Sequence, residues 1–393
     1  MKKFLKIGGV VLAVIVLGLA ITLLSALEEH PEGPPPSDSV ANPAFQVQAD
    51  AASARLAEIY RESMTPSLSV AVGVNGDLVW AEAIGYAHLD DAIPAKLDSK
   101  YRIGSVAKSL TAAAAGVLMD ANKLDIEVNF HSLVPSFPTK KYPFTMRQLG
   151  GHLAGIRHYR SGPRGFLFET YNQTQYDTVL DSLEFVEDDP LAFEPGTDFQ
   201  YSSFGYNVFS AGLVAASGEP FLALMQQSIF DPLAMTNTSP DYQDRPVENV
   251  VGFYIQYDDV LIRSPGVNNS YKWAGGGFLS TPSDLVKFGS ALLDDSLITR
   301  ATRDLLWTPQ LLANGEMNPQ FYGVGFRIGR MENGRLIVSH GGSSVGGITS
   351  FFIFPESNVV VAVTCNIAIL SSPLRIGQVA IEMAEFFIPA QST

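Results

Sequence analysis

The chain contains little cysteine and little histidine, and both shortages limit its chemistry. Cys365 is the single cysteine among 393 residues, so no disulfide can form within the chain. It ends the apolar run 359–364 with no basic residue beside it, which favours a buried core thiol over a nucleophile. The six histidines form neither His-Glu-x-x-His nor His-x-His-x-Asp-His, which argues against a zinc hydrolase. We expect no metal site and no cofactor.

Basic residues are also few. Lys and Arg total 26 against 40 Asp and Glu, which gives a formal net charge of -14. An acidic surface argues against nucleic acid, and against an anionic membrane surface, as the main partner.

One long hydrophobic stretch lies at the N-terminus. Lysines within the first six residues precede residues 7–27, which carry no charge and are about long enough to cross a bilayer. Residues 1–27 are therefore predicted to be an uncleaved membrane anchor. It would leave the catalytic part extracytoplasmic, on the bacterial inner membrane facing the periplasm. A cleaved signal peptide is the alternative. Residues 28–46, which contain three consecutive prolines, are predicted to be a solvated linker.

The remaining chain, residues 47–393, has strand patterns at both ends and helical patterns between them. Asn75-Gly76 between two apolar runs is a strong hairpin signal. Strands are predicted at 67–74, 77–84, 323–328, 335–339, 349–354 and 359–364, and helices at 51–62, 178–186, 206–217, 220–229, 283–293 and 374–387.

This order of elements predicts an α/β fold of the α+β type. Strands from both ends form one central antiparallel sheet flanked by helices, with a helical lobe inserted between them. The sheet lobe is predicted to comprise residues 47–104 and about 306–393, and the helical lobe about 105–305. The functional cleft is expected between the two lobes.

A hydroxyl and an amine are placed one helical turn apart in Ser105-Val106-Ala107-Lys108. Positions i and i+3 of a helix are neighbours, so Lys108 is predicted to reach the Ser105 Oγ atom. The apolar stretch that follows, residues 112–119, is expected to desolvate the amine and so lower its pKa. A neutral lysine can take the proton of a serine hydroxyl, which predicts a nucleophilic serine. The alternative is a serine that only caps the helix.

Two further motifs follow in the chain. Tyr201-Ser202-Ser203 is one, and the other is His340-Gly341-Gly342-Ser343 after a β-branched run. Ser-x-x-Lys, then Tyr-Ser-x, then His-Gly, in this order, resembles the serine β-lactamase and penicillin-binding-protein superfamily. The match is to its class C and esterase-like branch, and is closest to the serine β-lactamase-like (LACTB-like) proteins. It covers about residues 47–390, including the stretches 145–159 and 274–281.

The resemblance implies a β-lactamase-like two-lobed fold and a role for each motif residue. Ser105 would be the nucleophile of an acyl-enzyme, and Lys108 its base. Tyr201 would pass a proton between Lys108, the nucleophile and the leaving group. We expect a nearby cation, for which Lys108 is the candidate, to lower the pKa of Tyr201. The backbone N–H groups of Ser105 and Ser343 would hold the oxyanion.

Two positions depart from the superfamily's usual pattern. Ser203 stands where asparagine is usual, and its hydroxyl is shorter. His340 stands where β-lactamases carry lysine, and a neutral imidazole gives no permanent charge for a substrate carboxylate. We still expect Ser203, His340 and Gly342 on the substrate-binding side of the cleft, with His340 hydrogen bonded in its wall. His152 and His158 are predicted to cap and pack a helix end.

These observations predict a membrane-anchored serine hydrolase that cleaves an ester or amide bond in a small-molecule or peptide substrate. One alternative is a D,D-peptidase or β-lactamase, which His340 and Ser203 weaken. The other is a non-catalytic binding module with the same fold, against which the set of Ser105, Lys108 and Tyr201 argues.

Overall fold

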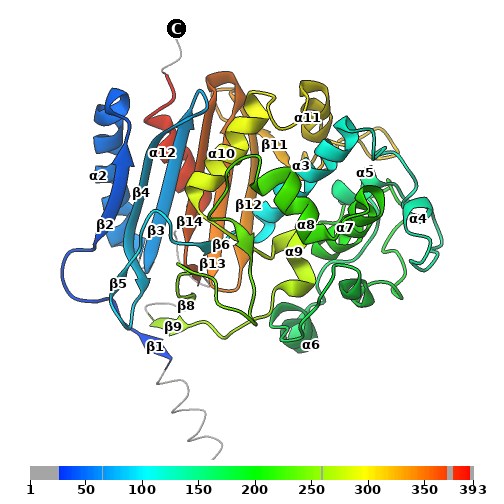
Figure 1. Cartoon of the computed structure of the whole chain (residues 1–393), viewed down its shortest axis with the longest axis horizontal. Coiled ribbons are helices and arrows are strands. Elements are labelled where there is room, and N and C mark those ends of the chain that lie inside the picture. Colours follow the sequence, from blue (N-terminus) through cyan, green and yellow to red (C-terminus); the bar gives the residue numbers. More distant parts are fainter. Residues whose placement is uncertain (1–25, 64, 258–259, 370–374, 390–393) are drawn as a thin grey trace, which may run out of the picture.

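The computed structural model describes residues 26–63, 65–257, 260–369 and 375–389 (Figure 1). Its strands are β1 (Leu27–Glu28), β2 (Ser37–Ala41), β3 (Ser67–Val74), β4 (Asp77–His88), β5 (Ile93–Pro94), β6 (Tyr101–Arg102), β7 (Ser239–Pro240), β8 (Tyr254–Tyr257), β9 (Val260–Arg263), β10 (Phe278–Ser280), β11 (Arg327–Arg330), β12 (Leu336–Ser344), β13 (Gly347–Phe354), β14 (Val359–Cys365) and β15 (Ile367–Ile369). The α-helices are α2 (Gln46–Ser63), α3 (Ala107–Asp120), α4 (Phe130–Leu133), α5 (Met146–Gly150), α6 (Gly162–Gly165), α7 (Ser203–Ser217), α8 (Phe221–Met225), α9 (Trp273–Gly276), α10 (Pro282–Leu293), α11 (Arg300–Trp307) and α12 (Ile376–Glu385). Short 3₁₀ or π turns are η1 (Pro43–Phe45), η2 (Gly104–Val106), η3 (Phe166–Thr170), η4 (Asp181–Phe185), η5 (Gln226–Phe230), η6 (Ser270–Lys272) and η7 (Pro355–Ser357).

The largest sheet takes its strands from both ends of the chain, in the order β11-β12-β13-β14-β3-β4-β2 (Figure 1). The C-terminal β14 pairs antiparallel with the N-terminal β3, from Val359 opposite Val74 to Cys365 opposite Leu68. Asn75 has a positive φ and helps to close the hairpin between β3 and β4, as its sequence predicts. The expected α+β fold, with one antiparallel sheet built from both ends, is confirmed.

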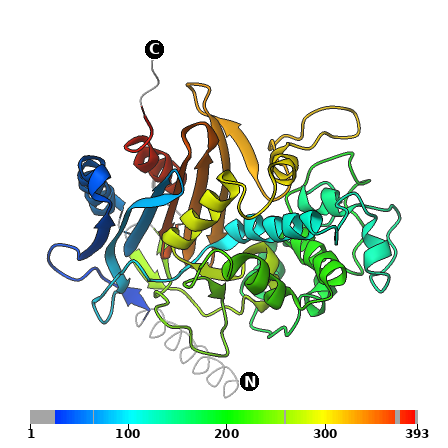
Figure 2. The ribbon, with the colours of Figure 1, turned by 45° about the horizontal axis from the view of Figure 1, so that its top comes forward.

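Alternating side chains of β14 bury the two faces of the sheet under different helices. Val359, Val361 and Val363 belong to a core with α2 and α12, whereas Val360 and Ala362 belong to a core with α10. Figures 1 and 2 show α12 and α10 on opposite faces of the sheet. Because both faces are covered, the whole strand is buried, which explains its continuous apolar sequence. Burial raises the pKa of the Cys365 thiol to about 12, as befits a core residue.

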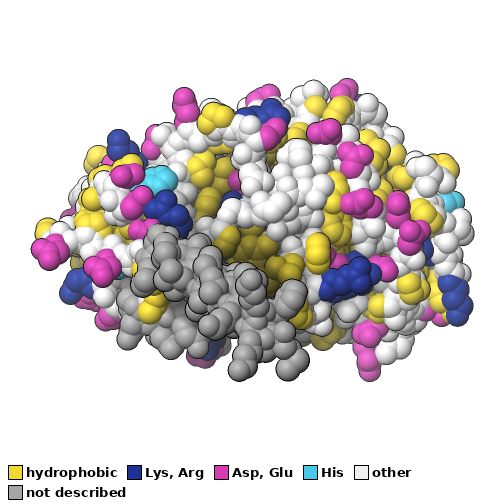
Figure 3. Space-filling view, turned by 90° about the horizontal axis from the view of Figure 1, so that it is seen from below, with side chains coloured by type: hydrophobic (Ala, Val, Ile, Leu, Met, Phe, Trp, Pro, Cys, Tyr) yellow, Lys and Arg dark blue, Asp and Glu magenta, His cyan; other side chains and the backbone are white. Residues whose placement is uncertain are grey.

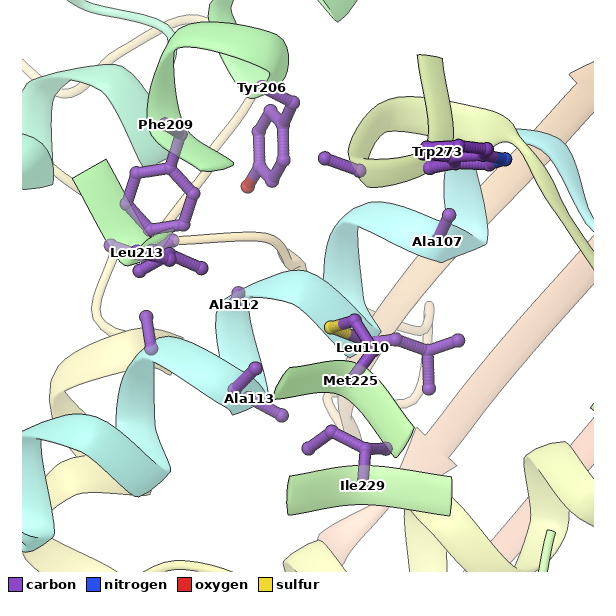
Figure 4. Close-up of a cluster of buried hydrophobic side chains, with 14 of the residues drawn as sticks. Ala107, Leu110, Ala112, Ala113, Tyr206, Phe209, Leu213, Met225, Ile229 and Trp273 are labelled. Carbon is purple, nitrogen blue, oxygen red and sulfur yellow. The ribbon is translucent and has the colours of Figure 1, made fainter. Parts of the chain in front are cut away.

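Helix α3 lies at the centre of the helical part of the molecule. Its residues are buried from Ala107 to Gly116, and it contacts α7, α8, η5 and α9. Figure 4 shows Leu110 and Ala113 of α3 beside Met225 and Ile229, with Leu213 of α7 nearby. Small alanine side chains let these helices approach α3 closely, and the packing removes its first turn from water.

Among the helices that the structure describes, none taken singly has the length and apolar character of a membrane span. A bent pair, α7 with the α8–η5 segment, meets these criteria, but its two parts meet at 78°. Most of α7 is buried in the core of the molecule.

The predicted N-terminal segments are only partly tested. The anchor falls outside the described residues up to residue 25, and Leu27 at its end pairs with Ile262 in a small sheet. The linker prediction for residues 28–46 is wrong over part of its length, because Ser37–Ala41 forms the edge strand β2 against β4. Strand β2 satisfies backbone groups that β4 would otherwise leave unpaired.

Three other elements differ from the predicted pattern. The helix predicted at 178–186 is only the 3₁₀ turn η4, and the strand predicted at 323–328 lies at Arg327–Arg330. Helix α10 falls within the predicted helical lobe but packs on the sheet, because Val286 and its apolar neighbours face β14 and β3. Apart from α10, the predicted division into a sheet lobe (47–104 and about 306–393) and a helical lobe (about 105–305) stays a prediction.

Candidate active site

Ser105 lies in the 3₁₀ turn η2, directly before α3, and its side chain is partly exposed at a cavity of about 500 Å³. Two glycines allow the backbone around it to pack tightly. Gly104 has a φ of +49°, and a Cβ there would lie 2.6 Å from the Ser343 backbone nitrogen. At Gly342, a Cβ would lie 1.9 Å from the Ile103 carbonyl oxygen. These close approaches bring the backbones of Ser105 and Ser343 together.

Lys108 is completely buried one turn after Ser105. Its Nζ atom lies 3.0 Å from Ser105 Oγ, 3.2 Å from Ser203 Oγ and 2.6 Å from the Gly275 carbonyl oxygen. The predicted contact between the amine and the Ser105 hydroxyl is therefore confirmed.

The charge state of Lys108 follows from its surroundings. Burial, aided by the cations Lys272 and Arg327, holds the pKa of its amine well below the usual range. A neutral amine has two N–H donors and one lone pair. The donors suit Gly275 and Ser203, which leaves the lone pair for the proton of Ser105.

Tyr201 lies just ahead of α7, with its ring centroid 5.0 Å from Lys108 Nζ. Burial of its hydroxyl raises the pKa of Tyr201, and this outweighs the lowering by a hydrogen bond with Ser105 and by Arg327. The expectation that Lys108 acts as the nearby cation is wrong, because the cation that acts on Tyr201 is Arg327, whose guanidinium lies 5.6 Å from the ring centroid. Tyr201 is therefore a protonated phenol in the resting site.

Ser203 is the first residue of α7 and is buried. Its hydroxyl meets Lys108, and its backbone N–H donates to His158 Nδ1 at 3.1 Å. The preceding residue, Ser202, donates its N–H to His152 Nδ1 at 3.1 Å. Both histidines thus accept N–H groups at the start of α7, which confirms the predicted capping. Burial lowers the pKa of both imidazoles, that of His158 to about 4, so they act as neutral acceptors.

The His-Gly-Gly-Ser segment forms part of β12, and only some of it reaches the cavity. Gly341 and Ser343 line the cavity, whereas Gly342 is buried against Ile103. His340 is 1% exposed and does not line the cavity. Its Nε2 atom lies 2.9 Å from the Tyr322 hydroxyl. Burial lowers the pKa of His340 to about 3, so the imidazole is neutral and forms part of the packing behind Tyr201. The geometry gives no support to a direct substrate contact by His340.

The cavity contains residues that sequence reasoning missed. Its described lining is Ser105, His158, Tyr159, Phe166, Thr170, Tyr171, Tyr201, Ser203, Lys272, Gly275, Gly276, Gly341, Ser343, Ser344, Val345 and Ala368. Lys272 is the main omission, although it lies only two residues before the stretch 274–281 that the resemblance includes. Within the described residues, no three His, Cys, Asp or Glu side chains are grouped to hold a metal ion.

Aromatic and apolar side chains form much of the cavity wall. On the lower face of the molecule, Figure 3 shows hydrophobic side chains gathered in a hollow near the centre, with most Asp and Glu side chains toward the edge. The arrangement brings a hydroxyl, a neutral amine and a phenol together beside a pocket with little negative charge. Such a site is suited to nucleophilic attack on a carbonyl carbon.

Comparison with known proteins gives consistent matches. A family model described as Beta-lactamase matches residues 56–377. The human mitochondrial serine beta-lactamase-like protein LACTB is 30% identical over 413 residues, which cover 79% of this chain and 75% of that protein. Penicillin-binding protein 4* of Bacillus subtilis (strain 168) is 26% identical over 292 residues, covering 71% of this chain and 63% of that protein. The solved structure of EstCE1, a hydrolase with promiscuous acyltransferase activity, has the same fold, with a TM-score of 0.73 at 20% identity over 88% of this chain and 99% of that one.

Proposed function

This chain belongs to the beta-lactamase family of serine hydrolases, and we propose that it cleaves an ester or amide bond through an acyl-enzyme on Ser105. The observation that supports this most directly is the 3.0 Å separation between Ser105 Oγ and the amine of the fully buried Lys108. A serine hydroxyl is a weak nucleophile until a base takes its proton, and a desolvated lysine supplies that base.

In the first step, Ser105 Oγ attacks the carbonyl carbon of the substrate while its proton passes to Lys108 Nζ. The carbonyl oxygen becomes an oxyanion, for which the N–H groups of Ser105 and Ser343 are the proposed donors. Gly104 and Gly342 make this pairing sterically accessible, since any side chain there would push the two backbone segments apart.

In the second step, the bond to the leaving alcohol or amine breaks, and the leaving group takes a proton from the Tyr201 hydroxyl. The raised pKa of Tyr201 suits a proton donor that holds its proton until the leaving group needs it. Tyr201 then regains a proton from the Lys108 ammonium, which restores the neutral amine. Water attacks the acyl-enzyme by the reverse sequence of proton transfers and releases the acid.

The reading as a D,D-peptidase or β-lactamase has less support. Of the two positions that depart from the superfamily's pattern, His340 is buried against Tyr322, and Ser203 lines the cavity but its hydroxyl already meets Lys108. His340 offers no charge to a substrate carboxylate, and the Ser203 hydroxyl is shorter than the usual asparagine side chain and already engaged. We therefore favour ester or amide substrates that do not depend on those two contacts.

Covalent labelling tests the proposal. A fluorophosphonate should form an adduct that mass spectrometry places on Ser105, and Ser105→Ala should abolish both the adduct and ester hydrolysis. Ser344 also lines the cavity, and Ser344→Ala serves as the matched control that keeps the adduct. An adduct on Ser344 instead would refute the assignment.

Membrane attachment through residues 7–27 is a further part of this proposal, and its support is the uncharged length of that segment behind several lysines. The full-length protein should remain in a detergent-extractable membrane fraction, and external protease should digest the catalytic part in spheroplasts. Recovery of a shortened, freely soluble form would indicate a cleaved signal peptide.

A further inference from the structure

A second lysine lines the cavity and takes no part in the proposed proton transfers. Lys272 ends η6, directly before α9, and is only 7% exposed. Within the parts of the chain that the structure describes, its Nζ atom forms no hydrogen bond and no ion pair, and it lies 5.2 Å from the centroid of the Tyr271 ring. An ammonium group that is nearly buried without an anionic partner is costly, so a partner from outside the protein is the natural explanation.

The charges near Lys272 leave its positive charge without compensation. Asp241 attracts it, but Asp241 Oδ2 already accepts from Arg102 Nε at 2.7 Å and from Asn269 Nδ2 at 2.5 Å. Arg102 and Asp241 therefore neutralise each other. None of the described residues that line the cavity is Asp or Glu. Although the chain has a net charge of -14, the described lining of this cavity holds the cation Lys272 and no acidic residue.

We infer that Lys272 binds an anionic group of the substrate, so that the natural substrate is an ester or amide that carries a carboxylate. This inference rests on the proposed function, because Lys272 and Ser105 line the same cavity. A bound carboxylate supplies the charge-assisted hydrogen bonds that the protein itself does not offer to the ammonium. Lys272 thereby takes the recognition role that His340 cannot fill.

The protonation of Lys272 is consistent with this role. Burial and Arg102 lower the pKa of its amine to about 8, while Asp241 acts in the opposite direction. The amine therefore remains mostly protonated at neutral pH. Tyr159, Phe166 and Tyr171 also line the cavity, which favours an apolar connection between the reacting carbonyl and the carboxylate.

Three esters of similar shape and different charge test the inference. They are 4-nitrophenyl hexanoate, the mono-4-nitrophenyl ester of adipic acid and 4-nitrophenyl 6-aminohexanoate, which end in a methyl, a carboxylate and an ammonium group. We expect kcat/KM for the adipate ester to exceed that for the hexanoate ester by about tenfold to a hundredfold, and the cationic ester to be the poorest. Lys272→Met should remove the preference for adipate, and Lys272→Arg should retain most of it. Lys123→Met, at an exposed position far from the cavity lining, is the control that keeps it.

Binding to an inactive protein separates this inference from the acyl-enzyme proposal. Calorimetric titration of Ser105→Ala with the intact esters measures affinity without chemistry, and Ser105→Ala/Lys272→Met measures the share due to Lys272. Tighter binding of the adipate ester that disappears in the double variant supports the inference, even if no ester is hydrolysed. Equal binding of the adipate and hexanoate esters, or a preference that survives Lys272→Met, overturns it. Absence of a phosphonate adduct on Ser105 would overturn the proposed function alone.

Discussion

Two buried lysines lie at the active site, Lys108 behind Ser105 and Lys272 in the cavity lining, and they differ in whether a carboxylate acts on them. Lys108, on α3, contacts only neutral oxygens, and the charged groups that act on it are the cations Lys272 and Arg327. The pKa of Lys272, on η6, is lowered less, to about 8: burial and Arg102 lower it, and the carboxylate of Asp241 acts in the opposite direction. Two buried amines thus suit different roles, Lys108 that of a neutral base and Lys272 that of a charged anchor. Cations lower the pKa of both amines, and a carboxylate opposes that lowering only at Lys272.

Removing Lys108 or Tyr201 should have the largest effect on activity. Lys108→Ala and Tyr201→Phe should each lower kcat for a neutral ester by about a hundredfold or more, because each removes a proton-transfer group. If both belong to one unit, the double variant should lose little beyond the worse single variant. Steady-state kinetics on all three variants, with Lys123→Met as the control, checks this. Losses that multiply would show that the two groups work independently.

Displacing the turn that carries Ser105 should have the next largest effect on activity. Gly342→Ala places a methyl group 1.9 Å from the Ile103 carbonyl oxygen, so the turn that carries Ser105 must move. We expect a loss of about 1–3 kcal/mol in the free energy of unfolding and up to about a hundredfold in kcat. Gly329→Ala in β11 is the matched control, because a Cβ there meets no atom within 4 Å. Denaturant unfolding and ester kinetics should show a lower free energy of unfolding and a lower kcat for Gly342→Ala than for Gly329→Ala. Equal values for the two variants would refute the proposed close contact between Gly342 and Ile103.

A smaller effect is expected from pH, which should act on the functions of the two lysines in opposite directions. Lys108 accepts a proton only when unprotonated, so kcat/KM for the neutral ester should fall as the pH drops through its lowered pKa, well below 10.5. Lys272 binds an anion only when protonated, so the preference for the adipate ester should fade as the pH rises through about 8. Lys272→Met removes a cation that lowers the pKa of Lys108, and so should move the acidic limb to higher pH. If the pKa of Lys108 rises by one unit, kcat/KM at pH values below that pKa should fall by about tenfold. An acidic limb that does not move, or moves to lower pH, would contradict the coupling between the two amines.

Much of the fold and the contact at the centre of the site could be predicted from the sequence. The contact between Ser105 and Lys108 follows from helix geometry, and the hairpin at Asn75-Gly76 follows from turn chemistry. The β14 run is recognisable because its residues are apolar on both faces. These features depend on residues close together in the chain, where periodicity carries the information.

The pairing of β2 and the orientation of His340 could not be predicted from local sequence patterns. Strand β2 is polar and looks like a linker, yet the open edge of β4 gives it backbone partners. His340 occupies the expected motif position, but packing turns its ring toward Tyr322 and away from the cavity. In both cases, the deciding partner lies far away in the sequence.

Local spacing and motif order in the sequence are enough to predict which hydroxyl and amine are neighbours, where the main strands run and which superfamily the chain resembles. The charge of each amine and the shape of the cavity, in contrast, depend on how distant segments pack together. Desolvation of Lys108 needs the helices packed around α3, and the pKa of Lys272 reflects its burial together with Arg102 and Asp241 from other segments of the chain. A pKa reflects every charge and every shielded surface around a group, and the fold assembles those from distant parts of the sequence.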